Sequence, residues 1–155
     1  MSSADDADDA AAISATNAAF YQAIEGADLD LMGSIWDTAD DVRCVHPGAA
    51  MVSGRSAVMR SWAVVMAGTP YIQFFITDVG VSLVGDVALV VCNENVLTGV
   101  ETPDGSPSGF AGGKAVATNV YRRTPAGWRL WAHHSSPVMS ASDAPDDDEQ
   151  EDQHG

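Results

Sequence analysis

Four side chains able to transfer protons stand beside apolar, strand-like runs in this chain. His46 precedes a Pro-Gly pair, His133 and His134 lie near the end of the segment 128–136, and Glu94 interrupts a run of valine and leucine. An imidazole titrates near neutral pH, and burial raises the pKa of a carboxyl group. Residues of these types in an apolar setting are suited to general acid–base chemistry.

The two neighbouring histidines cannot both enter one pocket, because adjacent residues of a strand point to opposite faces of its sheet. The faces predicted for this strand are Trp128, Leu130, Ala132, His134 and Ser136 on one side and Arg129, Trp131, His133 and Ser135 on the other. We expect the face without arginine to be the inner one. His134 is therefore predicted in the pocket, opposite Asn119, and His133 on the outer face. The alternative role for His134 is a structural hydrogen bond with a neighbour.

Glu94 and a set of aromatic side chains are further candidates for the pocket. Glu94 shares a strand face with Val90 and Cys92. A desolvated carboxylate there is a candidate acid or base, and the alternative is an exposed strand end. An aromatic wall suits a flat apolar ligand, although core packing accounts for the same residues. The aromatic candidates are Phe20, Tyr21, Trp36, Trp62 and Tyr121.

No motif for a metal or cofactor accompanies these residues. His46, His134 and Glu94 lack the local spacing of metal ligands. The chain also lacks a phosphate-binding glycine loop and a Gly-x-Ser-x-Gly elbow. The two cysteines, Cys44 and Cys92, lie in apolar runs typical of buried free thiols. We therefore expect no cofactor.

Periodicity and turn residues predict the elements that position these candidates. Apolar residues at helical spacing predict three helices, at 13–26, 28–36 and 55–67. Strands are predicted at 42–46, 50–53, 71–84, 87–100, 115–123 and 128–136. Proline and glycine predict a loop over 101–113. Helices followed by a run of long strands indicate the α+β class.

Acidic residues concentrate at the two ends of the chain. The net charge is −15, and residues 1–12 hold four Asp while residues 138–155 hold five Asp and two Glu. We expect two disordered acidic tails flanking one domain at 13–137. The absence of a basic face argues against a nucleic-acid partner. Without a membrane-length apolar run or a signal sequence, we expect no membrane partner and a cytoplasmic location.

The order of elements resembles the nuclear transport factor 2-like (NTF2-like) superfamily, and within it the SnoaL-like branch. The motifs that carry the resemblance are His46-Pro47-Gly48 after the first strand and Gly127-Trp128-Arg129-Leu130 before the closing His-His-Ser-Ser. The resemblance covers about 13–137. It implies a cone in which a curved, mostly antiparallel sheet wraps around about three N-terminal helices, often as a homodimer. Its members include isomerases, dehydratases and cyclases as well as binding and assembly modules, so the fold does not settle function.

Similarity to the ketosteroid-isomerase branch implies a general base at His46. The tyrosine donor of that family falls on Phe20, with Tyr21 beside it, and the second, acidic donor falls among apolar residues near 115–117. An enolate without donors at its oxygen is poorly stabilised, so these departures argue against a steroid-isomerase mechanism. The alternative for His46 is a hydrogen bond at the end of a strand.

Two hypotheses follow for this chain, both with a small apolar or ring-containing ligand and a homodimer. In the first, a cofactor-free isomerase, dehydratase or cyclase uses His46 as base, His134 as proton donor or orienting group and Asn119 as polar anchor. In the second, the domain is a non-catalytic module for ligand binding, dimerisation or assembly.

Overall fold

The computed structural model describes residues 3–101 and 107–139 and has the predicted α+β architecture. The helices are α1 (Ser3–Glu25), α2 (Leu29–Ile35) and α3 (Arg55–Gly68). The strands are β1 (Arg43–Val45), β2 (Val52–Ser53), β3 (Ile72–Val84), β4 (Val87–Glu101), β5 (Pro107–Thr124) and β6 (Gly127–Pro137). As predicted, Asp28 caps α2 by accepting a hydrogen bond from the backbone N–H of Leu31.

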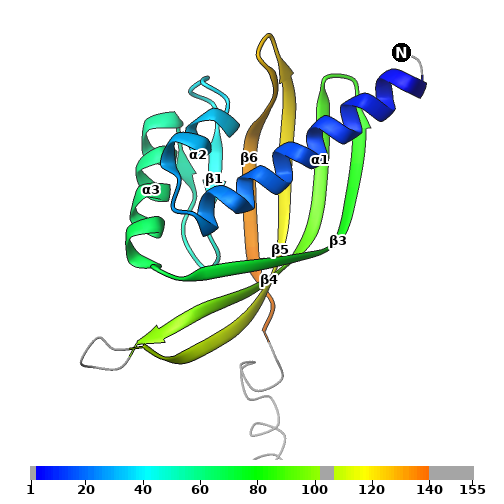
Figure 1. The fold of residues 1–155 in the computed structure, drawn as a ribbon. Coiled ribbons are helices and arrows are strands. Elements are labelled where there is room, and N and C mark those ends of the chain that lie inside the picture. The colour runs from blue at the N-terminus through cyan, green and yellow to red at the C-terminus, as the bar shows by residue number, and fades with distance from the viewer. Residues whose placement is uncertain (1–2, 102–106, 140–155) are drawn as a thin grey trace, which may run out of the picture.

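The strands form one mixed sheet in the order β2-β1-β6-β5-β4-β3. Only the β1–β6 pair is parallel in this described sheet, because the crossover through α3 and the three long strands brings β6 back beside β1. Irregularities at Thr77–Gly80 and Val120–Tyr121 interrupt the ladders, and such bulges increase the bend and twist of a sheet. Figure 1 shows α1 lying across the curved sheet, with α2 and α3 on the β1 side.

The first helix begins at Ser3, so most of the acidic segment predicted as a disordered tail is helical. Asp9 explains the extension, because its carboxylate accepts hydrogen bonds from the guanidinium of Arg123 at 2.6 Å and from Trp128 Nε1 at 3.1 Å. Composition alone showed a solvated run, whereas the partners of Asp9 lie more than 110 residues further along the chain. The predicted C-terminal tail lies, from residue 140 onward, outside the described residues.

Strand β5 begins at Pro107, eight residues before its predicted start. Gly112 and Gly113 pair with Leu97 and Val96 of β4. The prediction treated these glycines as loop residues. Their backbone groups nevertheless pair with β4, because ladder hydrogen bonds do not require a side chain. The predicted loop is thus strand from Pro107 onward, and residues 102–106 lie outside the described part of the chain.

The core lies between the three helices and the inner face of the sheet. Its largest fully buried side chains include Trp36, Tyr121 and Phe20. Cys44 and Cys92 are buried free thiols, as predicted, and burial raises the pKa of Cys44 to about 12. In the described ranges, no helix has the length and apolar character needed to cross a membrane.

Candidate functional site

A cavity of about 300 Å³ brings together three titratable side chains from three strands or their ends. His46 follows β1, Glu94 belongs to β4 and His133 belongs to β6. Trp62 of α3 and Phe74 of β3 supply aromatic surface, and the rest of the lining is apolar. The cavity therefore combines groups for proton transfer with walls suited to a ring compound.

His46 lines this cavity, and its role as a base stays a prediction. The Ser61 hydroxyl donates its hydrogen to the carbonyl of Val58 at 2.7 Å, so it accepts from Nε2–H of His46 at 2.9 Å. This arrangement leaves Nδ1 as the basic nitrogen. The ring packs edge-on against Trp62, with 4.5 Å between centroids. Desolvation lowers the pKa of His46, which keeps the imidazole neutral at neutral pH.

Glu94 is buried, with 3% of its surface exposed, rather than at a solvated strand end. Ser135 Oγ donates a hydrogen bond to Glu94 Oε1, and the hydroxyl of Tyr21 also bonds to this carboxyl group. Both bonds favour the carboxylate, but desolvation outweighs them and raises the pKa of Glu94. Glu94 is thus the group in the cavity best suited to hold and deliver a proton.

The prediction that placed His134 in the pocket and His133 outside was wrong. His133 is 3% exposed and lines the cavity, whereas His134 is exposed on the outer face. Tyr121 pairs with Leu130 and Val120 with Ala132, so Trp131 is an extra residue in β6. This β-bulge reverses the alternation: Trp128 and Leu130 point inward as predicted, but beyond the bulge the inner residues are His133 and Ser135.

Asn119 stands behind His133 and not in the cavity wall. Nδ1 of His133 lies 2.5 Å from Asn119 Oδ1, and Asn119 Nδ2 donates to Asn17 Oδ1 at 2.9 Å. The prediction that Asn119 lies opposite His134 was wrong, because Asn119 pairs with His133 across β5 and β6. Burial lowers the pKa of His133 to about 3, with the neighbouring histidines adding to the effect, so its ring is neutral.

The aromatic candidates divide between the cavity and the core. Trp62 lines the cavity, while Phe20 and Tyr121 are fully buried behind it. Trp36 borders a separate surface hollow beside Arg129. The indole Nε1 groups of Trp62 and Trp36 are buried and have no hydrogen-bond partner among the described residues. An unpaired buried donor is costly, so an acceptor on a ligand would stabilise the Trp62 site.

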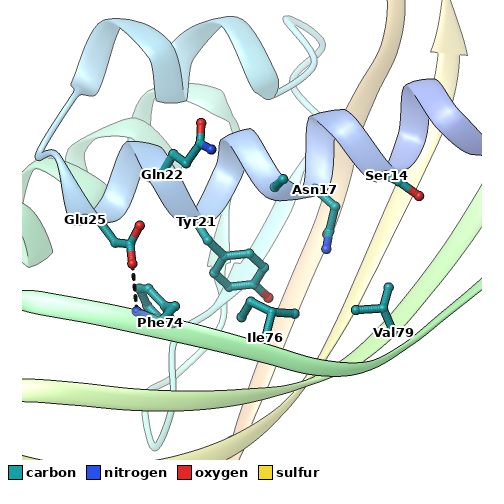
Figure 2. Close-up of a pocket in the computed structure, with 9 residues that line it drawn as sticks. Ser14, Asn17, Tyr21, Gln22, Glu25, Phe74, Ile76 and Val79 are labelled. Atoms are coloured by element: carbon teal, nitrogen blue, oxygen red, sulfur yellow. Dashed lines mark hydrogen bonds between the residues drawn. The ribbon is translucent and has the colours of Figure 1, made fainter.

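Tyr21 borders a second hollow of about 410 Å³ between α1 and β3. Figure 2 shows Asn17 and Tyr21 extending from α1 toward β3, and Glu25 accepting a hydrogen bond from the backbone N–H of Phe74 at 2.8 Å. Phe74 lines both hollows. The polar lining here is satisfied within the protein or exposed, so this hollow lacks the unpaired groups of the first.

Within the described ranges 3–101 and 107–139, no group of three or more His, Cys, Asp or Glu has the arrangement of a metal site. The residues that sequence reasoning missed are His133, Ser135 and Ser61. Ser61 directly precedes Trp62 within α3 and carries no local signal of its own, and the bulge that turns His133 inward depends on pairing with β5.

The sequence matches the SnoaL-like domain family over residues 13–140. The chain belongs to this family. It thereby falls in the NTF2-like superfamily, as the order of its elements and its histidine motifs indicated. The match spans α1 from Ile13 onward, α2, α3 and all the described strands, so it includes the residues that line the cavity.

Two solved structures show how far the similarity extends. A candidate dehydratase of the NTF2-like family from Streptomyces avermitilis is 48% identical, covers 85% of this chain and 98% of its own, and superposes with a TM-score of 0.80. A candidate calcium/calmodulin-dependent protein kinase type II association domain from Thiobacillus denitrificans is 35% identical, with 81% and 94% covered and a TM-score of 0.69.

A curated relative shares the domain within a longer protein. The F-box protein SKIP8 of Arabidopsis thaliana is 25% identical over 128 residues, which is 83% of this chain and 50% of that protein. This chain therefore spans half the length of that relative.

Proposed function

We propose that this chain is a cofactor-free dehydratase acting on a small, uncharged ring compound with a hydroxyl group β to a carbonyl. The observation that carries the proposal is the convergence of His46, Glu94 and His133 on one apolar cavity. Support also comes from the 48% identical structure described as a candidate dehydratase. Since no lysine or arginine lines the cavity, it favours a neutral ligand over a carboxylate.

His46 and Glu94 transfer the protons in the proposed elimination. His46 Nδ1 removes the proton from the carbon next to the carbonyl, and the electrons of that C–H bond form the new C=C bond. The C–O bond to the β-hydroxyl breaks, and that oxygen leaves as water after taking the proton of Glu94. A proton passes back from the imidazolium to the Glu94 carboxylate, which restores the enzyme. The indole N–H of Trp62 donates to the carbonyl oxygen, whose charge grows as the C–H bond breaks.

Turnover of a simple β-hydroxy ketone tests this proposal. The full chain is incubated with 3-hydroxyindan-1-one and with 3-hydroxycyclohexan-1-one, and enone formation is followed by ultraviolet absorbance. Loss of a general acid or base reduces the rate by about 10²–10⁴-fold, so we expect His46→Gln and Glu94→Gln to fall in that range. His134→Gln is the matched control, because its ring lies on the outer face. No turnover by the wild type, or equal loss in all three variants, contradicts the proposal.

A second candidate function is assembly through the outer face of the sheet, independent of chemistry in the cavity. Phe75, Leu89, Val91 and Val116 expose between 38% and 53% of their surface on neighbouring strands β3 to β5. An apolar face of this kind is typical of a protein–protein contact. We propose that two copies pair through it, which agrees with the similarity to a candidate association domain. Both functions can coexist, because the cavity opens on the opposite side of the sheet.

A further inference from the structure

Behind the cavity, a chain of buried hydrogen bonds ends at the hydroxyl of Tyr121. Tyr121 donates to Asn17 Oδ1 at 2.8 Å, Asn119 Nδ2 donates to the same oxygen at 2.9 Å, and Asn119 Oδ1 lies 2.5 Å from His133 Nδ1. Tyr121 and Asn119 are fully buried, and Asn17 is 4% exposed. The proposed dehydration uses none of these three residues, so their arrangement needs a separate explanation.

We propose that Tyr121 acts as a positioning residue that sets the tautomer of His133 through Asn17 and Asn119, so that Nε2 of His133 is a permanent acceptor for a hydroxyl group of the ligand. This inference rests on the proposed cavity but not on the reaction carried out there. It adds a requirement to the ligand class: an O–H donor facing His133, in addition to the carbonyl that faces Trp62.

The direction of the hydrogen bonds follows from the hydroxyl of Tyr121. In the described residues, the acceptor within reach of that hydroxyl hydrogen is Asn17 Oδ1. If the oxygen and nitrogen of both amides exchanged places by a 180° rotation, Asn17 would present its NH₂ group to Tyr121. The buried hydroxyl of Tyr121 would then lack an acceptor. With the amides as they stand, Asn17 directs its NH₂ group to Cys92 and Asn119 offers only its oxygen to the imidazole.

The consequence for His133 is a proton on Nδ1 and a lone pair on Nε2. The Nδ1 edge of the ring faces Asn119, which is absent from the cavity wall, while the ring itself lines the cavity. The Nε2 edge is therefore the one available to a ligand. Because the imidazole stays neutral, this nitrogen accepts a hydrogen bond and does not donate one.

Among the described residues, few charged groups surround the imidazole of His133. Its tautomer therefore depends on the hydrogen bonds that run from Tyr121 through the amides of Asn17 and Asn119. His46 and His134 are the titratable neighbours that affect its charge, and Glu94 lines the same cavity. Phe20 and Trp62 cover the ring, with centroids 4.9 Å and 5.9 Å away. These aromatic neighbours hold the plane of the imidazole but do not distinguish its two nitrogens.

Long-range ¹H–¹⁵N correlation spectra of the full ¹⁵N-labelled chain test the proposal without any assay of activity. We expect the Nδ1–H tautomer for His133 in the wild type. In Tyr121→Phe the constraint on the amides is removed, and we expect a mixture with the Nε2–H form. Tyr71→Phe is the matched control, because Tyr71 is exposed and, among the described residues, its hydroxyl donates a hydrogen bond to Gln73. A wild-type Nε2–H form overturns the proposal, whether or not Tyr121→Phe folds.

A pair of ligands that differ in one donor provides the second readout. 1-Indanol carries an O–H group, and 1-indanone of nearly the same shape carries only an acceptor. In Tyr121→Phe only the Nδ1–H fraction of His133 accepts from the O–H group, so we expect binding of 1-indanol to weaken by up to about fivefold, the usual loss for one hydrogen bond, and binding of 1-indanone not to weaken. Equal effects on both ligands, or none on the tautomer, overturn the inference. Neither outcome bears on whether β-hydroxy ketones are dehydrated, which the turnover assay decides separately.

Discussion

The imidazoles of His133 and His134 lie on opposite faces of β6, the first against the cavity and the second in solvent. His133 contacts Asn119 and Phe20, whereas His134 pairs through its backbone with Thr118 and Val45. We expect His133→Gln to weaken binding of 1-indanol by about fivefold, because the flexible amide does not hold an acceptor at the position of the imidazole Nε2. His134→Gln should leave binding unchanged and alter the unfolding free energy by less than about 0.5 kcal/mol. Calorimetric titration and urea unfolding of both variants check this; equal effects contradict the placement.

Trp62 lines the cavity and carries a buried indole N–H without a partner among the described residues, so its removal should affect ligands but not stability. Trp62→Phe keeps an aromatic ring and deletes a donor that has no partner among the described residues, so we expect unfolding free energy within about 1 kcal/mol of wild type. Binding of 1-indanone should weaken by about tenfold, because its carbonyl loses that donor. Trp36→Phe removes an equally unpaired donor outside the cavity and serves as the matched control. Unchanged ketone binding in Trp62→Phe contradicts the role of this donor.

The buried imidazole of His133 should make the protein less stable in acid. Its pKa is lowered to about 3 in the folded state, below the ordinary value of 6.5. The stability from this neutral ring is fully present above pH 6.5 and is lost as the pH falls toward 3, because the unfolded chain binds the proton more readily. The loss is at most about 1.4 kcal/mol per pH unit. Urea unfolding at a series of pH values between 3 and 6.5 gives the unfolding free energy as a function of pH. This free energy should fall less steeply with decreasing pH in His133→Gln than in the wild type, and an identical pH dependence contradicts the prediction.

The buried carboxyl group of Glu94 should make the protein less stable as the pH rises, opposite to the effect of His133. Burial raises the pKa of Glu94 above its ordinary value of 4.5, so the folded state retains this proton to higher pH than the unfolded chain does. Its contribution to stability is present below pH 4.5 and is lost as the pH rises through the folded pKa. Glu94→Gln should remove that loss, so its stability at neutral pH should equal or exceed that of wild type. A variant that loses stability with rising pH as steeply as wild type would falsify this assignment.

Arg122 of β5 forms ion pairs with the segment after α2 and packs against Trp131, the extra residue of the β-bulge. Its guanidinium pairs with Asp37 at 2.5 Å and Asp41 at 2.6 Å, and it lies 4.7 Å from the Trp131 ring. We expect Arg122→Met to lower the unfolding free energy by about 2 kcal/mol, since Asp37 is largely buried and loses its cation. Arg60→Met, at an exposed position on α3, should change it by less than about 0.5 kcal/mol. Thermal and urea unfolding of both variants measure the difference, and equal stabilities count against it.

The outer face of the sheet should hold two copies together. Val91 lies in the middle of β4 on this face, opposite Thr118. A charge buried there without a partner disrupts an interface, so we expect Val91→Lys to be monomeric where the wild type is a dimer. Val84→Lys, at the end of β3 and 77% exposed, is the control. Sedimentation equilibrium gives the masses; a monomeric wild type removes the assembly proposal and leaves the cavity chemistry untouched.

The sequence by itself determined the class of fold and the residues near the cavity. Hydrophobic periodicity and capping residues act within a few positions of the chain, so α2 with its Asp28 cap, α3 and the long strands were predictable. Glu94 was singled out because it interrupts a run of valine and leucine, and Trp62 as an aromatic residue on the apolar face of a helix. His46 was singled out through the resemblance to the ketosteroid-isomerase branch.

Tertiary structure decided which histidine of the neighbouring pair faces the cavity. The extra residue Trp131 depends on the register between β5 and β6, so it reverses the alternation without a local signal. The helical start of α1 depends on the distant Arg123 in the same way, and the tautomer of His133 depends on Tyr121 through two amides. Sequence patterns of period 2 or 3.6 show only which face a residue would occupy in an uninterrupted strand or helix. They therefore cannot predict properties that depend on contacts between distant segments.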